Sequence, residues 1–136
     1  MDAEQARDHI RSNPQAVLAT MRRDGTPQMS PVVCAVDDNG RVVISTRETA
    51  VKTKNALRDG RAWLCVLPKG FYGSWVQVEG AVDVVSLPEA MDGLVDYYRR
   101  VAGEHDDWDD YRAAMQREQR CLLRLDITRA GPDVSG

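Results

Sequence analysis

The sequence predicts a mainly β (α+β) domain, a small antiparallel barrel of about six strands with helices inserted late in the chain. Two tight-turn signals, Arg23-Asp24-Gly25 and Asp38-Asn39-Gly40, separate three β-prone runs. Residues 75–85 alternate between apolar and polar side chains, which is typical of a half-buried strand. Strands joined by tight turns pair antiparallel, because parallel strands need a long crossover connection.

The position of each apolar run, and of the residues that end it, predicts the individual elements. Strands are expected over residues 16–21, 26–36, 41–46, 62–67, 75–85 and 121–128, the first three forming a meander. Helices are expected over residues 2–12, 49–58 and 88–102, with a fourth beginning near Asp107. Thr49 is the expected N-cap of the second helix, and Gly80 indicates a bulge or a close backbone approach. Residues 131–136 are expected to form a loose tail.

Length, charge and cysteine content narrow the functional classes. At 136 residues the chain is expected to form one domain, residues 1–136. The net charge of −3 argues against nucleic acid or an anionic membrane as a partner. No apolar run approaches the roughly 18 residues of a transmembrane helix, and no secretory signal precedes the domain. Cys34, Cys65 and Cys121 lack C-x-x-C spacing, so reduced, buried thiols and a cytoplasmic location are expected.

The segment with the clearest chemical signal is the strand-to-helix junction STRETAVKTKN, residues 45–55. Residues 47–61 carry five basic and two acidic side chains, +3 in a chain of −3. Free backbone N–H groups of Ala50, Val51 and Lys52 at the helix start are expected to point at an anion. A phosphate-binding site would then be completed by the hydroxyl groups of Ser45, Thr46 and Thr49 and the ammonium groups of Lys52 and Lys54. The alternative is a basic helix face that is simply exposed to solvent.

Other reactive constellations are weak. His9 and His105 are the only histidines, and the acidic residues around His105 fit helix capping better than calcium binding, so no metal is expected. The chain has no G-x-S-x-G, Walker or G-x-G-x-x-G element. No side chain is assigned as a catalytic acid or base, which indicates that a cofactor carries the reaction.

Four segments, in this order, add a resemblance to these arguments. They are VLATMRRDGTPQMSPVV, RVVISTRETAVKTKNALRDGRAWL, VQVEGAV and YYRRVAGEHDDWDDYRAAM. Together they resemble the pyridoxamine 5′-phosphate oxidase-like split-barrel superfamily, specifically its flavin/deazaflavin oxidoreductase branch. The last segment is similar to the helical insert of mycobacterial split-barrel proteins that prefer the deazaflavin coenzyme F420 over FMN.

The resemblance implies a six-stranded split β-barrel of the FMN-binding type and a homodimer whose cofactor sites lie at the subunit interface. It assigns the cofactor phosphate to Lys52, Thr53, Lys54 and Asn55, and the adjoining positions to Ser45, Thr46, Arg47, Thr49, Ala50 and Val51. It assigns the ring of the cofactor to Gln28, Ser30, Pro31 and Val32. Trp75 is expected near the ring or packed in the subunit interface, and one aromatic side chain can serve both roles.

The activity that the resemblance implies is hydride transfer between coenzyme F420 and a small conjugated organic substrate. Ala50 and Val51 occupy positions where many FMN-binding relatives carry basic residues, which favours F420. The chain ends soon after Thr128 and lacks the C-terminal Arg and His substrate motif of pyridoxamine-phosphate oxidases, so vitamin B6 oxidation is not expected. Two alternatives stay open: an FMN-binding oxidase of the same fold, and a non-catalytic protein that binds and presents F420.

Overall fold

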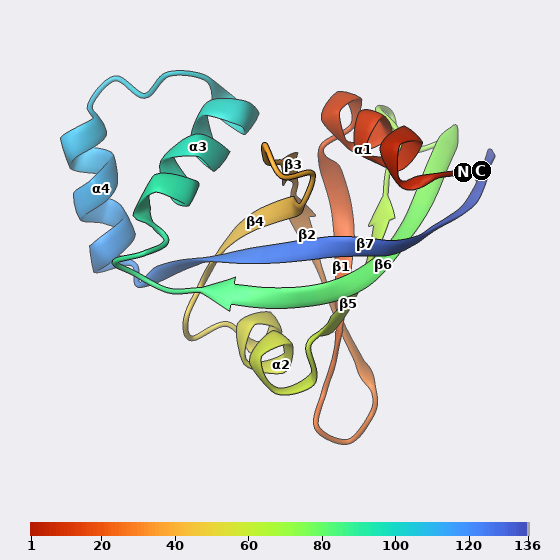
Figure 1. Cartoon of the computed structure of the whole chain (residues 1–136), viewed down its shortest axis with the longest axis horizontal. Helices are drawn as coiled ribbons and strands as arrows, with labels where there is room; N and C mark the ends of the chain where they lie inside the picture. Colours follow the sequence, from red (N-terminus) through yellow and green to blue (C-terminus); the bar gives the residue numbers. More distant parts are fainter. Residues whose placement is uncertain (136) are drawn as a thin grey trace.

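The computed structural model describes the backbone of residues 1–135 and the side chains as far as Pro132. One antiparallel sheet holds seven strands in the order β2-β1-β5-β6-β7-β4-β3. The strands are β1 Gln15–Met21, β2 Pro27–Val33, β3 Ala35–Val36, β4 Val42–Arg47, β5 Arg61–Val66, β6 Ser74–Val85 and β7 Arg120–Ser135. The helices are α1 Ala3–Ser12, α2 Val51–Asp59, α3 Met91–Ala102 and α4 Trp108–Arg117. This confirms the mainly β fold with flanking helices (Figure 1).

The sheet is curled into a barrel, and its strand order explains why. β2 and β3 form its two opposite edges, yet Cys34 alone separates them in the chain. Both edges must therefore come together at Cys34, whose N–H donates to the carbonyl of Pro14 at 2.7 Å. The run expected as one strand over residues 26–36 is thus two strands, and the expected meander is wrong. The hairpins β1–β2 and β3–β4 lie at opposite ends of the sheet order.

The long pair β6 and β7 spans the molecule in Figure 1, with α3 and α4 at one end and α1 toward the other. Their register shifts between Glu79 and Gly80, where a Cβ on Gly80 would lie 1.8 Å from the carbonyl oxygen of Asp126. The expected close approach at Gly80 is confirmed. β7 runs on to Ser135 and pairs there with Ser74, so the expected loose tail is wrong for residues 131–135. Gly136 lies outside the described residues.

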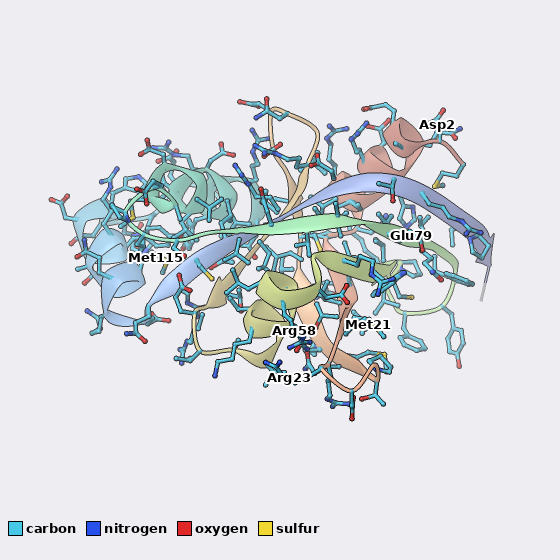
Figure 2. The ribbon with its side chains drawn as sticks, turned by 60° about the horizontal axis from the view of Figure 1, so that its bottom comes forward. Asp2, Met21, Arg23, Arg58, Glu79 and Met115 are labelled. Carbon is cyan, nitrogen blue, oxygen red and sulfur yellow. The ribbon has the colours of Figure 1, made fainter. Side chains whose placement is uncertain are left out.

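Two apolar clusters hold the fold together. The first fills the barrel with inward-facing strand residues such as Leu18, Leu64 and Leu125, and Ile10 of α1 covers one opening. The second packs α3 and α4 against the other side of β4 and β7, through residues that include Leu94, Met115, Val43 and Leu122. Figure 2 shows Met115 at that end of the molecule. Alternation along β4 and β7 therefore serves two cores, one on each face of the sheet.

Helix α2 lies under the barrel, with an uncapped start and a glycine at its end. Ala50, not the expected Thr49, is its N-cap and makes no side-chain capping bond. Gly60 ends the helix in the left-handed region at φ 77°, where a side chain would be strained. Arg58 also reaches the strand beside it, donating to the carbonyl of Met21 (Figure 2).

The three cysteines differ in how deeply they are buried. Cys34 and Cys121 are buried and Cys65 is half-buried, all as free thiols. Burial raises the pKa of Cys34 to about 12 and that of Cys121 to about 11, so both stay protonated and unreactive. Within residues 1–135, no helix has the length and apolar character needed to cross a membrane. Nor do those residues gather three metal-ligating side chains in one place.

Candidate functional site

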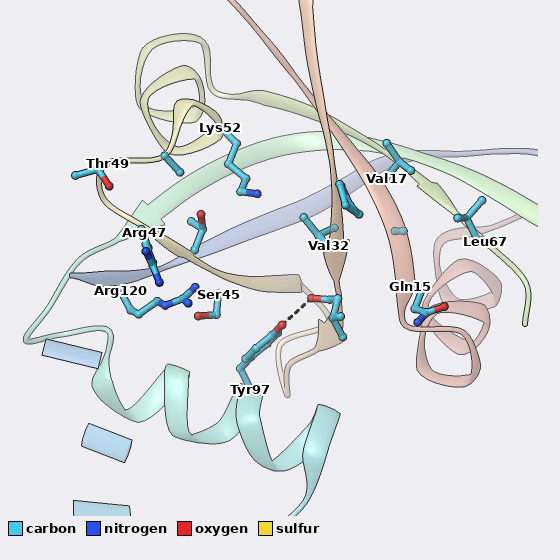
Figure 3. A pocket seen from close by; sticks show the side chains of 15 residues that line it. Gln15, Val17, Val32, Ser45, Arg47, Thr49, Lys52, Leu67, Tyr97 and Arg120 are labelled. Atoms are coloured by element: carbon cyan, nitrogen blue, oxygen red, sulfur yellow. Dashed lines mark hydrogen bonds between the residues drawn. The ribbon is translucent and has the colours of Figure 1, made fainter. Parts of the chain in front are cut away.

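A cleft of about 650 Å³ opens between the two halves of the barrel (Figure 3). One wall is made by the neighbouring strands β1 and β2, and the other by the end of β4 and the start of α2. Leu67, which follows β5, and one residue each from α3 and β7 complete the lining. The lining residues are Gln15, Ala16, Val17, Pro31, Val32, Val33, Ser45, Thr46, Arg47, Thr49, Ala50, Lys52, Leu67, Tyr97 and Arg120.

One end of the cleft is strongly basic. Arg47 and Arg120 stand directly opposite each other on the antiparallel pair β4–β7. Glu118 serves both, since its Oε1 accepts from Arg47 Nη2 at 3.3 Å and from Arg120 Nη2 at 2.9 Å. Like charges in directly opposed positions destabilise a sheet, and one carboxylate offsets only part of the repulsion. The positive charge that Glu118 does not neutralise favours the binding of an anion at this end of the cleft.

Lys52 brings a third cation to the same end. Its Nζ donates to the hydroxyl of Ser30 at 3.0 Å, which links α2 to β2 across the cleft. Partial burial, and next the nearby Arg120 guanidinium, lower the pKa of Lys52 below its ordinary value. Both effects disfavour the charged ammonium, and the negative charge of an anion placed beside it would offset them.

The start of α2 adds backbone donors. The N–H of Ala50 is taken by the carbonyl of Arg47 at 3.1 Å. Within the described part of the chain, the N–H groups of Val51 and Lys52 have no hydrogen-bond partner. Two of the three N–H groups expected to bind an anion are therefore available. An uncapped helix start beside three cationic side chains suits a phosphate.

The opposite end of the cleft is uncharged and mainly apolar. In Figure 3, Gln15, Val17 and Leu67 lie there, and Val32 stands between them and the basic end. Tyr97 of α3 forms the lower wall, where its hydroxyl donates to the carbonyl of Val33 at 2.8 Å. Burial raises the pKa of Tyr97, which keeps the phenol protonated at neutral pH. The cleft is thus polarised along its length, from cationic to apolar.

The structure brings together only some of the residues singled out in the sequence. Eight line the cleft: Ser45, Thr46, Arg47, Thr49, Ala50, Lys52, Pro31 and Val32. A ninth, Ser30, contacts Lys52. Thr53 and Asn55 are buried, where the Thr53 hydroxyl donates to the carbonyl of Arg47 and the Asn55 amide donates to the Thr20 hydroxyl. Those two polar side chains are occupied in holding the helix.

The remaining predicted residues do not line the cleft. Val51 and Lys54 are exposed on α2. Gln28 lies further along β2, with a buried Oε1 that has no partner among the described residues. Trp75 lines a separate hollow.

Sequence reasoning missed several lining residues, notably Tyr97 and Arg120. Tyr97 lies on α3, a helix whose apolar stripe indicated only packing. Arg120 precedes the run read as a strand, and its place opposite Arg47 follows from strand pairing that the sequence does not display. Gln15, Val17 and Leu67 carried no chemical signal of their own.

Comparison with known proteins gives the family. The sequence profile of pyridoxamine 5′-phosphate oxidase matches residues 3–131, nearly the whole chain. The chain belongs to the pyridoxamine 5′-phosphate oxidase family. The split-barrel resemblance seen in the sequence is therefore confirmed at the level of family and fold.

Several solved structures are similar to the chain over most of its length. A conserved hypothetical protein from Mycobacterium tuberculosis superposes with TM-score 0.79 at 25% identity, covering 99% of this chain and 85% of that one. An F420 reductase superposes with TM-score 0.71 at 20% identity, covering 91% and 94%. A pyridoxamine 5′-phosphate oxidase-related, FMN binding protein from Nostoc punctiforme gives 0.66 at 13% identity, covering 93% and 81%. Such low identities show the shared fold alone.

Proposed function

We propose that the protein is an oxidoreductase that transfers a hydride between coenzyme F420 and a small conjugated organic substrate. The observation that carries the proposal is the pairing of Arg47 with Arg120 beside Lys52, at one end of a cleft that becomes apolar at the other. A cofactor with a charged phosphate at one end and a flat ring at the other matches this arrangement of a basic end and an apolar end. When bound, the deazaflavin supplies the hydride chemistry itself.

The residues present fit such a group. The phosphate would be held by Arg47, Lys52 and Arg120, together with the free N–H groups of Val51 and Lys52. The ring would lie against Pro31 and Val32, toward Val17 and Leu67. The chain's own contribution is to anchor one end by charge, to orient the ring against β2, and to exclude water at the apolar end.

Two observations also fit the alternative functions. FMN also ends in a phosphate, and a protein of this fold is an FMN binding protein. In addition, none of the residues lining the cleft is Asp, Glu, His or Cys, which suits a non-catalytic F420-binding protein as well as an enzyme. Turnover of reduced F420 with a panel of enones and tetrapyrroles separates the enzyme from the binding protein.

The cofactor is tested by titrating the purified protein with F420 and with FMN, followed by cofactor fluorescence. We expect F420 to bind more tightly, and tighter binding of FMN would contradict the assignment. Lys52→Met, which keeps the apolar stem, is expected to weaken F420 binding about 10- to 100-fold, the loss of a charge-assisted contact. Lys54→Met is the matched control, because Lys54 is exposed on the same helix and does not line the cleft.

We also propose that the protein forms a homodimer with the cofactor sites at the subunit interface. The outer face of β2, β1 and β5 supports this, because it is apolar in successive rows. Pro31 and Val17 form one row, and Met29, Ala19 and Trp63 form the next. Met29 in the second row is 63% exposed. Pro31 and Val17 in the first row also line the cleft. A partner on this face would cover apolar area and close the open side of the cleft.

A further inference from the structure

A second hollow, of about 260 Å³, adjoins the apolar end of the cleft. Its lining is Cys65, Leu67, Phe71, Tyr72 and Trp75, and Leu67 lines the cleft as well. No Asp, Glu, Lys or Arg takes part, although charged residues make up 29% of the chain. The hollow is therefore an uncharged, mainly aromatic extension of the cleft.

The position of the hollow relative to the basic end of the cleft indicates what it could bind. Leu67 lies at the far end of the cleft from Arg47 and Arg120 (Figure 3). A cofactor anchored by its phosphate at the basic end directs its ring toward Leu67. The aromatic hollow then lies beside the ring, where the molecule that exchanges a hydride with it has to sit.

The loop that carries Phe71 and Tyr72 is held by two backbone hydrogen bonds and contains a strained residue. The Phe71 N–H donates to the carbonyl of Pro68 at 3.1 Å, and the Tyr72 N–H to that of Gly70 at 3.0 Å. Phe71 has φ 80°, in the left-handed region that a bulky side chain rarely adopts. Backbone strain of this kind is typical of functional sites, because folding alone would favour glycine here.

The two rings are also displayed at the surface. Phe71 is 64% exposed and Tyr72 is 76% exposed, and their centroids lie 5.1 Å apart with an interplanar angle of 89°. This edge-to-face arrangement leaves ring surface free for a further aromatic molecule. Packing within the chain does not account for two neighbouring aromatic side chains in such a position.

We propose that this hollow binds the organic substrate, and that the substrate is an uncharged planar conjugated molecule of one or two fused rings. The proposal rests on the proposed function, since the cofactor ring defines the neighbouring position. A cavity of about 150 Å³ takes one benzene ring, so a hollow of about 260 Å³ suits one or two rings. The absence of a cationic side chain from its lining disfavours carboxylates.

The test uses coumarin as the uncharged two-ring probe and coumarin-3-carboxylate as its charged counterpart. Both are titrated into the full-length protein without cofactor, and the indole N–H signals of Trp63, Trp75 and Trp108 are followed by NMR. Trp75→Phe assigns the Trp75 signal. We expect coumarin to move the Trp75 signal in a saturable way and to leave the other two in place. The carboxylate is expected to bind at least about fivefold more weakly.

Two variants and one control examine the loop. Tyr72→Ala is expected to weaken coumarin binding about three- to tenfold, which corresponds to losing an aromatic contact. Phe71→Gly is expected to weaken binding and at the same time raise the Tm, because glycine relieves the left-handed φ. Leu57→Ala removes an equally exposed apolar side chain, 65% exposed on α2, and is expected to leave binding unchanged.

Three results would overturn the proposal. They are a Trp75 signal that coumarin does not move, equal affinity for the carboxylate, and a dimer that Tyr72→Ala converts to a monomer in sedimentation velocity. The last result would make the hollow a subunit contact. F420 binding is measured separately, so a protein that binds coumarin but not F420 would contradict the proposed function and leave the preference of the hollow for uncharged rings established.

Discussion

Lys52 and Lys54 are two residues apart on α2 and meet different surroundings. Lys52 reaches Ser30 on β2 and lies close enough to Arg120 for the two charges to interact. Lys54 points to solvent. On a helix, neighbours two positions apart face different directions, so a basic run such as VKTKN never presents all its charges to one ligand. Of the two lysines, only Lys52 lines the cleft.

The lowered pKa of Lys52 predicts how anion binding depends on pH. An anion favours the ammonium form, so binding raises the pKa of Lys52 and takes up a proton once the free protein begins to lose it. Affinity for inorganic phosphate should therefore fall as the pH rises through the lowered pKa, earlier than an ordinary lysine allows. Calorimetric titration at several pH values checks this. A pH-dependence that persists unchanged in Lys52→Met would assign it to another group.

Asn55 was expected to hold the cofactor phosphate, and its contacts support a different prediction. It is 3% exposed, donates to the Thr20 hydroxyl at 3.1 Å and accepts from Arg58 at 3.0 Å. Asn55→Ala leaves a buried Thr20 hydroxyl unpaired and should lower the free energy of unfolding by about 1–3 kcal/mol. Urea denaturation measures the loss, with Lys54→Ala expected to stay within about 0.5 kcal/mol. Cofactor affinity of the folded Asn55→Ala protein should be unchanged, and a large decrease would return Asn55 to the binding site.

At the scale of elements, the cleft is assembled from pieces with separate structural roles. Strand β7 lies between β6 and β4 and carries core residues on both faces, yet its first residue is Arg120. Helix α3 packs Leu94 and Val95 into the second core, and Tyr97, just beyond them, lies in the cleft wall. The helical segment therefore does more than cover the sheet, because its attachment positions one side chain of the site.

Gly80 gives the element-scale prediction. The crossing of β6 and β7 requires a residue without a Cβ there, since a methyl group would lie 1.8 Å from backbone that cannot move independently. Gly80→Ala should cost at least about 2 kcal/mol of unfolding free energy. Gly93→Ala is the matched control, because its Cβ would meet only the end of the Leu122 side chain at 2.8 Å and alanine favours the helix. Equal costs for the two substitutions would contradict the importance of the crossing.

At the scale of the whole molecule, one prediction concerns both the outer face of the sheet and the cleft. Met29→Asp places a charge on the exposed apolar rows and should convert the proposed dimer to a monomer, because a buried unpaired carboxylate is strongly unfavourable. Sedimentation velocity measures the change, and F420 affinity should fall with it. The stability of the subunit itself should hardly change, since Met29 is 63% exposed. A protein that is monomeric before substitution would refute the shared site.

Much of this molecule could be predicted from local sequence. Turn residues predicted the two hairpins and alternation predicted β6, and the charge run coincides with the basic end of the cleft at the start of α2. These features depend on neighbours within a few residues, where backbone geometry and side-chain periodicity are fixed. The resemblance to a known family then predicted the split-barrel fold as a whole.

Only the tertiary structure decided which of the candidate residues meet. The break at Cys34, which sends β2 and β3 to opposite edges of the sheet, depends on barrel closure and not on any turn signal. That closure aligns β7 with β4, sets Arg120 opposite Arg47, and turns Asn55 inward while Lys52 faces the cleft. The sequence by itself determined a β-barrel with a basic helix start. Long-range strand pairing decided the cleft, because contacts between residues far apart in the chain leave no local pattern.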